Sequence, residues 1–170
     1  MKERNGIITI DGKPVTLLGT EIKGGQKAPD FIVHNENFVK ITLSSFLGKK
    51  CIVVGVISLE FRSCSNIVLK LDSYAQTLQD TEILIISMDL PYAMKRWKKT
   101  NEIHKALLFS DHREASFGLK FGILLKEMRV LATSTFILDR DGFIRHMQIP
   151  KDASDPLDFD LMVEAARNIP

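Results

Sequence analysis

Hydrophobic and polar positions alternate over the start of the chain in the pattern of a β-hairpin. Two runs rich in aliphatic residues, 6–10 and 15–18, lie on either side of Asp11 and Gly12. An Asp-Gly pair between two such runs is a strong signal for a tight turn. The pattern therefore predicts an N-terminal hairpin at about 6–19.

The middle of the chain alternates between the periodicities of strands and helices. An apolar run at 51–57 predicts a buried strand, and a helix is predicted at about 65–79 from the helical spacing of Ile67, Leu71, Tyr74, Ala75 and Leu78. A strand at 82–87, a helix at about 91–99 and a strand at 107–109 follow. Before this region we expect short strands at 28–33 and 38–41 and a brief helix at 42–47.

The last part of the chain predicts a second hairpin and a closing helix. Runs at 132–138 and 143–147 flank the turn residues 139–142. The segment 156–169 has the pattern of a helix with these inward positions: Leu157, Leu161, Met162 and Ala165. Strands that alternate with helices predict a partly parallel sheet with helices on its faces. The element order is typical of a thioredoxin-like α/β fold, with a central mixed sheet flanked by helices and an N-terminal β-hairpin.

The composition changes this picture little. The chain has 170 residues, enough for one domain with a real core, so we expect a single domain over 1–170. It has 23 Lys and Arg against 21 Asp and Glu, with the two signs interspersed, which indicates no nucleic-acid surface. The polar start is unlike a secretory signal, and the apolar run at 51–57 is too short for a bilayer. These features predict a cytoplasmic protein without nucleic-acid or membrane partners.

The two cysteines are expected to be reduced thiols that do not pair. Cys51 begins the predicted strand and Cys64 follows its far end, so about six steps of about 3.3 Å separate them. A disulfide requires Cα atoms within about 7 Å. We therefore interpret Cys51 as a small buried hydrophobic residue.

Cys64 has the more reactive position. It follows a central strand and precedes the predicted helix, at the edge where open α/β sheets place their ligand sites. Backbone N–H groups and the dipole at a helix N-terminus favour a thiolate over a thiol. Cys64 is therefore the candidate nucleophile, with Arg62 as the candidate cation beside it. The alternative interpretation is one more buried small residue.

Other chemistries have weaker support. The chain has no Cys-x-x-Cys pair, and Gly24-Gly25 lacks the Gly-Lys-Ser/Thr of a phosphate loop. Its histidines lack the spacing of metal ligands and are expected on the surface or in loops: His34, His104, His112 and His146. No metal or cofactor is therefore expected.

Four separated segments resemble a known family. They are 25–31 (Gly-Gln-Lys-Ala-Pro-Asp-Phe), 86–93 (Ile-Ser-Met-Asp-Leu-Pro-Tyr-Ala), 110–113 followed by Phe117-Gly118, and Leu131-Ala132 ahead of 136–139. In this order they resemble the thiol peroxidase subfamily of the peroxiredoxins. The resemblance implies reduction of hydrogen or organic peroxides by a peroxidatic cysteine, a resolving cysteine whose disulfide thioredoxin reduces, and a homodimer. It assigns the peroxidatic role to Cys64.

The resemblance also shows which helper residues have been replaced. In the family, a threonine orients the peroxide, an arginine assists it and a second cysteine resolves the oxidised first one. Phe61, Thr133 and Lys98 stand at these positions here. Losing one preorganised donor commonly slows a reaction about a hundredfold or more. Without a resolver, the oxidised Cys64 needs an external thiol reductant such as thioredoxin.

Two hypotheses therefore remain open. The first is a one-cysteine, peroxiredoxin-type thiol peroxidase that acts through Cys64. The second is a catalytically degenerate relative that keeps the fold and acts as a binding or regulatory protein. The first predicts peroxide consumption that Cys64→Ser abolishes, and the second predicts that Cys64 reacts no faster than a free thiol.

Overall fold

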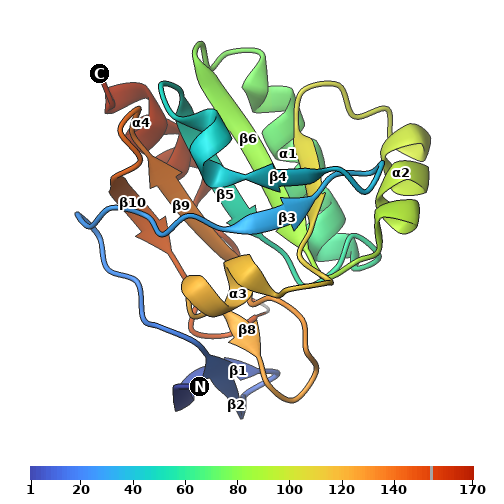
Figure 1. The fold of residues 1–170 in the computed structure, drawn as a ribbon, viewed down its shortest axis with the longest axis vertical. Helices are drawn as coiled ribbons and strands as arrows, with labels where there is room; N and C mark the ends of the chain where they lie inside the picture. The colour runs from blue at the N-terminus through green and yellow to red at the C-terminus, as the bar shows by residue number, and fades with distance from the viewer. Residues whose placement is uncertain (154) are drawn as a thin grey trace.

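A seven-stranded sheet in the order β10-β9-β5-β6-β7-β3-β4 organises the molecule in the computed structural model, which describes residues 1–153 and 155–170 (Figure 1). Its parallel centre consists of β5 (Lys50–Gly55), β6 (Thr81–Ser87) and β7 (Leu107–Ser110). Antiparallel strands flank this centre: β9 (Ser134–Leu138) and β10 (Ile144–Gln148) on one side, β3 (Ile32–His34) and β4 (Lys40–Thr42) on the other.

The N-terminal hairpin belongs to a smaller sheet of order β1-β2-β8. Its strands are β1 (Glu3–Ile10), β2 (Lys13–Leu18) and β8 (Leu124–Leu125). Asp11 and Gly12 both have positive φ, 49° and 74°, which is the geometry that favours Asp-Gly in a two-residue hairpin turn. Figure 1 shows this sheet at the end of the molecule that carries the N-terminus.

Helices cover the large sheet on its two faces. They are α1 (Arg62–Ala75), α2 (Pro91–Thr100), α3 (Ser116–Lys120) and α4 (Phe159–Asn168), with a 3-10 turn η1 (Leu43–Phe46). Alternate residues of a strand point to opposite faces. Ile52 and Val54 pack with α1, α2 and α4, whereas Val53 packs with α3 and the smaller sheet. The sheet therefore separates two apolar cores.

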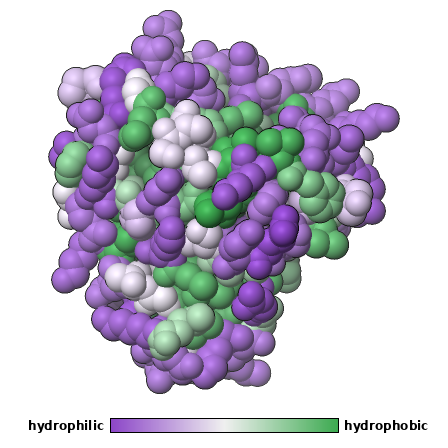
Figure 2. Space-filling view, viewed as in Figure 1, coloured by the Kyte–Doolittle hydropathy of each residue, from purple (hydrophilic) through white to green (hydrophobic). Residues whose placement is uncertain are grey.

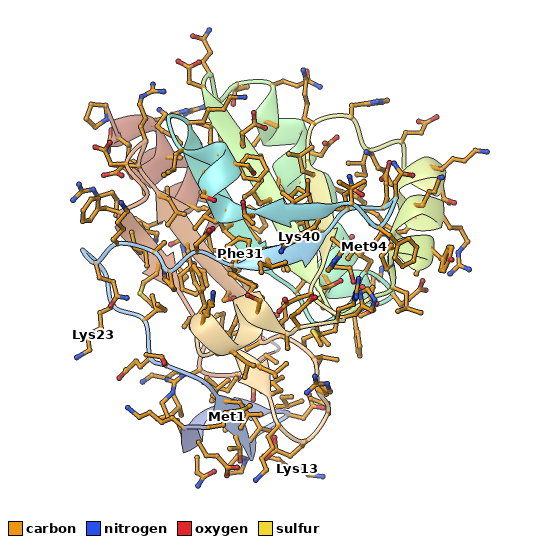
Figure 3. The ribbon with its side chains drawn as sticks, viewed as in Figure 1. Met1, Lys13, Lys23, Phe31, Lys40 and Met94 are labelled. Carbon is orange, nitrogen blue, oxygen red and sulfur yellow. The ribbon has the colours of Figure 1, made fainter. Side chains whose placement is uncertain are left out.

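Figure 3 labels one side chain from each core. Phe31 packs edge-on against Phe117 and Phe121, with ring centroids 5.0 and 5.7 Å away. Met94 lies on the side of α2 that faces the sheet and is buried in the core that contains Cys64. Each core contains side chains from elements that lie far apart in the sequence.

The element order and the mixed sheet confirm the predicted α/β arrangement, with differences at element ends. The strand expected at 51–57 ends at Gly55, and the helix expected at 65–79 begins earlier, at Arg62. The strand expected from 28 begins only at Ile32, where the chain is past Pro29, which has no N–H for a ladder. Two short elements, α3 and β8, were not predicted because five and two residues carry no periodicity.

The predicted inward face of the last helix is partly wrong. Leu161 is 44% exposed, while Val163 and Ala166 are buried beside Met162. The helix begins at Phe159, after Asp158 accepts a hydrogen bond from the backbone N–H of Leu161. With this start, Met162 and Ala166 lie about one turn apart on the inward side of the helix. Leu161 lies about 100° around the helix from Met162 and therefore faces solvent. Among the described residues, no helix is both long enough and apolar enough to cross a membrane.

Candidate active site around Cys64

Cys64 lies in the first turn of α1, at the carboxyl end of the central strand β5. It is the third residue of a 14-residue helix, so the helix begins two residues before it rather than just after it. The first N–H groups of a helix have no partner within it and carry the positive end of its dipole. The backbone environment predicted for Cys64 is therefore present.

The side chain of Cys64 is enclosed by apolar residues. It is 2% exposed and shares a core with Val56, Leu59, Val68 and Met94. The structure gives no hydrogen bond to its Sγ from any residue that it describes. The thiol is thus free and buried, and no side chain among residues 1–153 and 155–170 donates to it.

An aspartate fixes the loop that leads into α1. The Asp89 carboxylate accepts hydrogen bonds from the Ser58 hydroxyl at 2.7 Å, the Leu59 backbone N–H at 2.8 Å and the Ser87 hydroxyl at 2.8 Å. These bonds tie the loop after β5 to the end of the neighbouring parallel strand β6. Asp89 was not singled out from the sequence, although a Ser-x-Asp sequence at the end of a predicted central strand is a usable signal.

A second contact joins the loop, α1 and α2 next to Cys64. The indole Nε1 of Trp97 donates to the Ser65 Oγ at 3.0 Å, and the Ser65 hydroxyl donates to the Leu59 carbonyl at 3.2 Å. Trp97 is 8% exposed and belongs to the same core as Cys64. No local pattern in the sequence indicates this polar partner of Trp97, because Ser65 lies 32 residues away.

Phe61 and Arg62 both lie on the outside of this turn. Phe61 is the N-cap residue of α1, its side chain makes no capping hydrogen bond and its ring is 56% exposed. The ring therefore lies mostly in solvent, outside the core that encloses Cys64. Arg62 is exposed, and no hydrogen bond or ion pair of its guanidinium is found within the described part of the chain.

Thr133, at the expected arginine position, does face α1. It is 5% exposed and lies just before β9. With Ser63, Asn66 and Ile67 it lines a hollow of about 240 Å³, whose other side includes Pro156, Leu157 and Phe159. An arginine at this position, just before β9, would extend into the hollow beside the first turns of α1.

Lys98, at the expected resolving position, lies in the last turn of α2. Its Nζ is 3.4 Å from Glu36 Oε2, and its side chain is 32% exposed. The ion pair holds this lysine side chain partly against the protein surface. Lys98 directly follows Trp97, whose indole donates a hydrogen bond to Ser65 in α1. The expected resolving position is therefore one residue away from the contact between α2 and α1.

Cys51 lies on the opposite face of the sheet from Cys64. It packs in the core with α3 and the smaller sheet, and both cysteines are free. Burial, with a smaller contribution from the Glu82 carboxylate, raises the pKa of the Cys51 thiol to about 12. Cys51 is therefore unreactive at neutral pH and lies too far away to resolve an oxidised Cys64.

The histidines do not form a metal site. No group of three or more His, Cys, Asp or Glu within the described residues has the geometry to hold a metal ion. His34, predicted on the surface or in a loop, is 3% exposed on β3, with its Nδ1 3.7 Å from Glu114 Oε2. That prediction was wrong because β3 is covered by the segment after β7, where the His112 ring lies 6.0 Å from His34.

Known proteins resemble this chain over nearly its whole length. Residues 24–147 match the AhpC/TSA family. A thiol peroxidase of Listeria innocua is 38% identical over 160 residues, which cover 94% of this chain and 97% of the relative. A thiol peroxidase of Bacillus subtilis is 37% identical over 160 residues, with 94% and 96% covered.

Solved structures agree with the fold. A peroxiredoxin-like protein from Aquifex aeolicus superposes with a TM-score of 0.89 at 24% identity, over 96% of each chain. This likeness confirms the predicted thioredoxin-like fold, and the sequence relatives confirm the resemblance. The chain therefore belongs to the AhpC/TSA family and, within it, to the peroxiredoxin-type thiol peroxidases.

Proposed function

We propose that the chain reduces hydrogen or organic peroxides through Cys64 and depends on an external thiol. The observation that carries the proposal is the position of Cys64 in the first turn of α1, at the carboxyl end of β5. Unpaired N–H groups at this position favour the negative charge that the nucleophile carries. The thiol peroxidase relatives support the same assignment.

The proposed reaction has two stages. The Cys64 thiolate attacks the hydroxyl oxygen of a peroxide, so that an S–O bond forms, the O–O bond breaks and the departing alkoxide or hydroxide takes up a proton. The product is a sulfenic acid on Cys64. An external thiol attacks that sulfur and water leaves, and a second thiol breaks the mixed disulfide, restoring Cys64 and releasing the oxidised reductant.

The reductant must be external because nothing in the chain replaces the resolver. Lys98 carries no sulfur, and Cys51 lies across the sheet with its pKa raised by burial to about 12. A dithiol protein such as thioredoxin is the class of reductant proposed. The two free thiols are compatible with the predicted cytoplasmic location.

A homodimer is also proposed, supported by an exposed apolar patch. Phe38, Val39, Leu90 and Tyr92 are 40–73% exposed, and the Phe38 and Tyr92 rings lie 4.9 Å apart. Figure 2 shows hydrophobic surface beside α2 and the loop between β3 and β4, where these residues belong. His112, in one of the segments that resemble the family, borders the patch, with its ring centroid 6.3 Å from that of Phe38.

The second hypothesis, a binding or regulatory role without catalysis, has one observation in its favour. Cys64 is 2% exposed, and no described residue donates a hydrogen bond to its Sγ. A relative that kept only the fold and the apolar patch would have such a site.

Peroxide consumption with a thiol reductant tests the proposed function. The protein is expected to consume peroxide catalytically, Cys64→Ser to abolish turnover and Cys51→Ala to retain it, since Cys51 is outside the site. Turnover that survives Cys64→Ser would rule the proposal out, and folded, reduced protein without any turnover would favour the binding role.

A further inference from the structure

The carboxylate of Asp89 joins the ends of two parallel strands to the loop that leads to Cys64. Its Oδ1 accepts a hydrogen bond from the Ser58 hydroxyl at 2.7 Å, and its Oδ2 accepts from the Leu59 backbone N–H and the Ser87 hydroxyl, both at 2.8 Å. A hydrogen bond to an ionised acceptor is roughly twice as strong as one between neutral groups. Asp89 therefore fixes both a side chain and the backbone at the beginning of the loop.

The same carboxylate orders the rest of the loop through Ser58. The Ser58 Oγ accepts the backbone N–H of Glu60 at 3.1 Å, and the Ser58 carbonyl accepts that of Phe61 at 3.2 Å. A hydroxyl has one proton and two lone pairs, so Ser58 donates to Asp89 and accepts from Glu60 at once. The N–H groups of three successive residues, 59 to 61, are thus used within the loop or by Asp89.

The next three backbone N–H groups have no hydrogen-bond partner among the described residues. They belong to Arg62, Ser63 and Cys64, and the first bond across the start of α1 runs from the Ser65 N–H to the Phe61 carbonyl at 2.9 Å. Unpaired N–H groups at a helix start carry partial positive charge, which stabilises an anion in the first turn. The loop therefore leaves three donors free in the turn that contains Cys64.

The start of α1 has no cap of its own. Its N-cap residue, Phe61, makes no side-chain capping bond, and the first turn contains no acidic residue. The Arg96–Glu60 ion pair spans 3.4 Å, but the two side chains are 75% and 66% exposed, so the pair contributes little. The direction of the backbone at the helix start therefore depends strongly on the loop that Asp89 holds.

We propose that Asp89 is a positioning residue for Cys64: by holding Ser58 and Leu59, it keeps the N–H groups of the first turn of α1 oriented to stabilise the thiolate. Its side-chain contacts are with the loop and β6, and it acts through them. The carboxylate's own charge opposes a second negative charge nearby, so the benefit comes from its acceptor oxygens. This role deepens the peroxidase function proposed above and rests on Cys64 being its reactive group.

The pH dependence of Cys64 alkylation by iodoacetamide in the full chain tests this role, with Cys51 distinguished by peptide mass spectrometry. The reagent reacts with the thiolate, so Asp89→Ala should raise the pH of the half-maximal rate by about half a unit to one unit. Asp89→Asn keeps an oxygen for the Leu59 N–H and gains an amide that donates to the Ser58 Oγ. Its half-maximal pH should equal or fall below that of the original chain.

Asp72→Ala is the matched control. Asp72 lies in the same helix, and its carboxylate likewise holds a loop, through the backbone N–H groups of Lys105 and Ala106, both at 2.7 Å. Its removal should lower the free energy of unfolding without changing the half-maximal pH. Urea unfolding measures the stability of each variant.

An unchanged half-maximal pH in Asp89→Ala would overturn the role. So would an increase in Asp89→Asn or in Asp72→Ala as large as that in Asp89→Ala. If Asp89→Ala does not fold, Ser58→Ala decides, because it removes the hydroxyl between Asp89 and the Glu60 N–H and should raise the half-maximal pH as well. Alkylation needs no peroxide, so failure of the positioning role is distinct from failure of the peroxidase.

Discussion

At the scale of single residues, the first turn of α1 gives Cys64 the backbone expected of a nucleophilic site, and we infer that the helper side chains of the family are replaced around it. The first turn of α1 supplies oriented N–H groups, but Phe61 and Arg62 are exposed and Thr133 carries no charge. Electrostatic assistance by a positioned donor is often the largest single contribution to catalysis. A slow peroxidase is the expected consequence.

Thr133→Arg is predicted to restore part of this assistance. The hollow of about 240 Å³ between Thr133 and α1 has room for a longer side chain. The second-order rate constant of Cys64 with hydrogen peroxide should rise about tenfold to a hundredfold, as expected for one regained donor. Stopped-flow oxidation measures it. Thr133→Leu, which fills the hollow without a charge, is the control, and an arginine variant no faster than the leucine variant would contradict the role assigned to this position.

The residues that the sequence revealed are those whose role depends on their own chemistry. Cys64 could be proposed as a nucleophile because its thiol is visible in the sequence, and Thr133 could be singled out only through the resemblance to the family. Asp89 and Ser65 could not, because their importance comes from partners 30 and 32 residues away. The exposure of Phe61 and the burial of His34 likewise depend on packing that no local pattern encodes.

At the scale of elements, strong periodicity located the strands and helices, and the ends depended on local detail. The strand β5 and helix α1 were predicted, but the helix start at Arg62 was not, since Phe61 carries no side-chain capping signal. The short helix α3 was missed because five residues carry no periodicity, and its start is stabilised by Asp111. That carboxylate accepts the backbone N–H groups of Phe117 at 3.1 Å and Gly118 at 2.8 Å.

Asp111 gives the fold a measurable pH dependence. Burial raises the pKa of Asp111 to about 6, above its value in an unfolded chain, so the folded protein binds a proton that the unfolded protein has released. The contribution to stability is therefore present at low pH and is lost as the pH rises through about 4 to 6. Relative to Asp111→Asn, the original chain should lose on the order of 1–3 kcal/mol of unfolding free energy over this range.

Urea unfolding at a series of pH values measures this effect as the difference between the two proteins, since other carboxyl groups titrate in the same range. A difference in unfolding free energy that stays constant from about pH 4 to 7 would show that Asp111 has no raised pKa. A difference that grows with the opposite sign would show that its pKa is lowered.

At the scale of the whole molecule, the sheet separates two cores and leaves an apolar patch at one edge. Cys51 and Cys64 lie in different cores, which explains structurally why the sequence correctly excluded a bond between them. The patch around Phe38 and Tyr92 remains uncovered in the single chain. Exposed aromatic clusters of this kind mark interaction surfaces.

Tyr92→Lys is predicted to weaken the proposed homodimer. Tyr92 is 73% exposed, so the substitution should leave the monomer's stability nearly unchanged while placing a charge in the interface. Sedimentation equilibrium should show a dissociation constant raised about tenfold or more. Leu161→Lys, an exposed apolar position on α4 outside the patch, is the control. A chain that is monomeric before any substitution would exclude the homodimer.

The most direct test of a peroxidatic role for Cys64 is its oxidation rate with hydrogen peroxide, followed by stopped flow with a dimedone trap for the sulfenic acid. The same thiol in urea-unfolded protein provides the reference. A peroxidatic site, even one without its arginine and threonine, predicts a rate constant at least about tenfold higher in the folded chain. A folded, reduced protein whose Cys64 is oxidised no faster than in the unfolded chain would contradict that role.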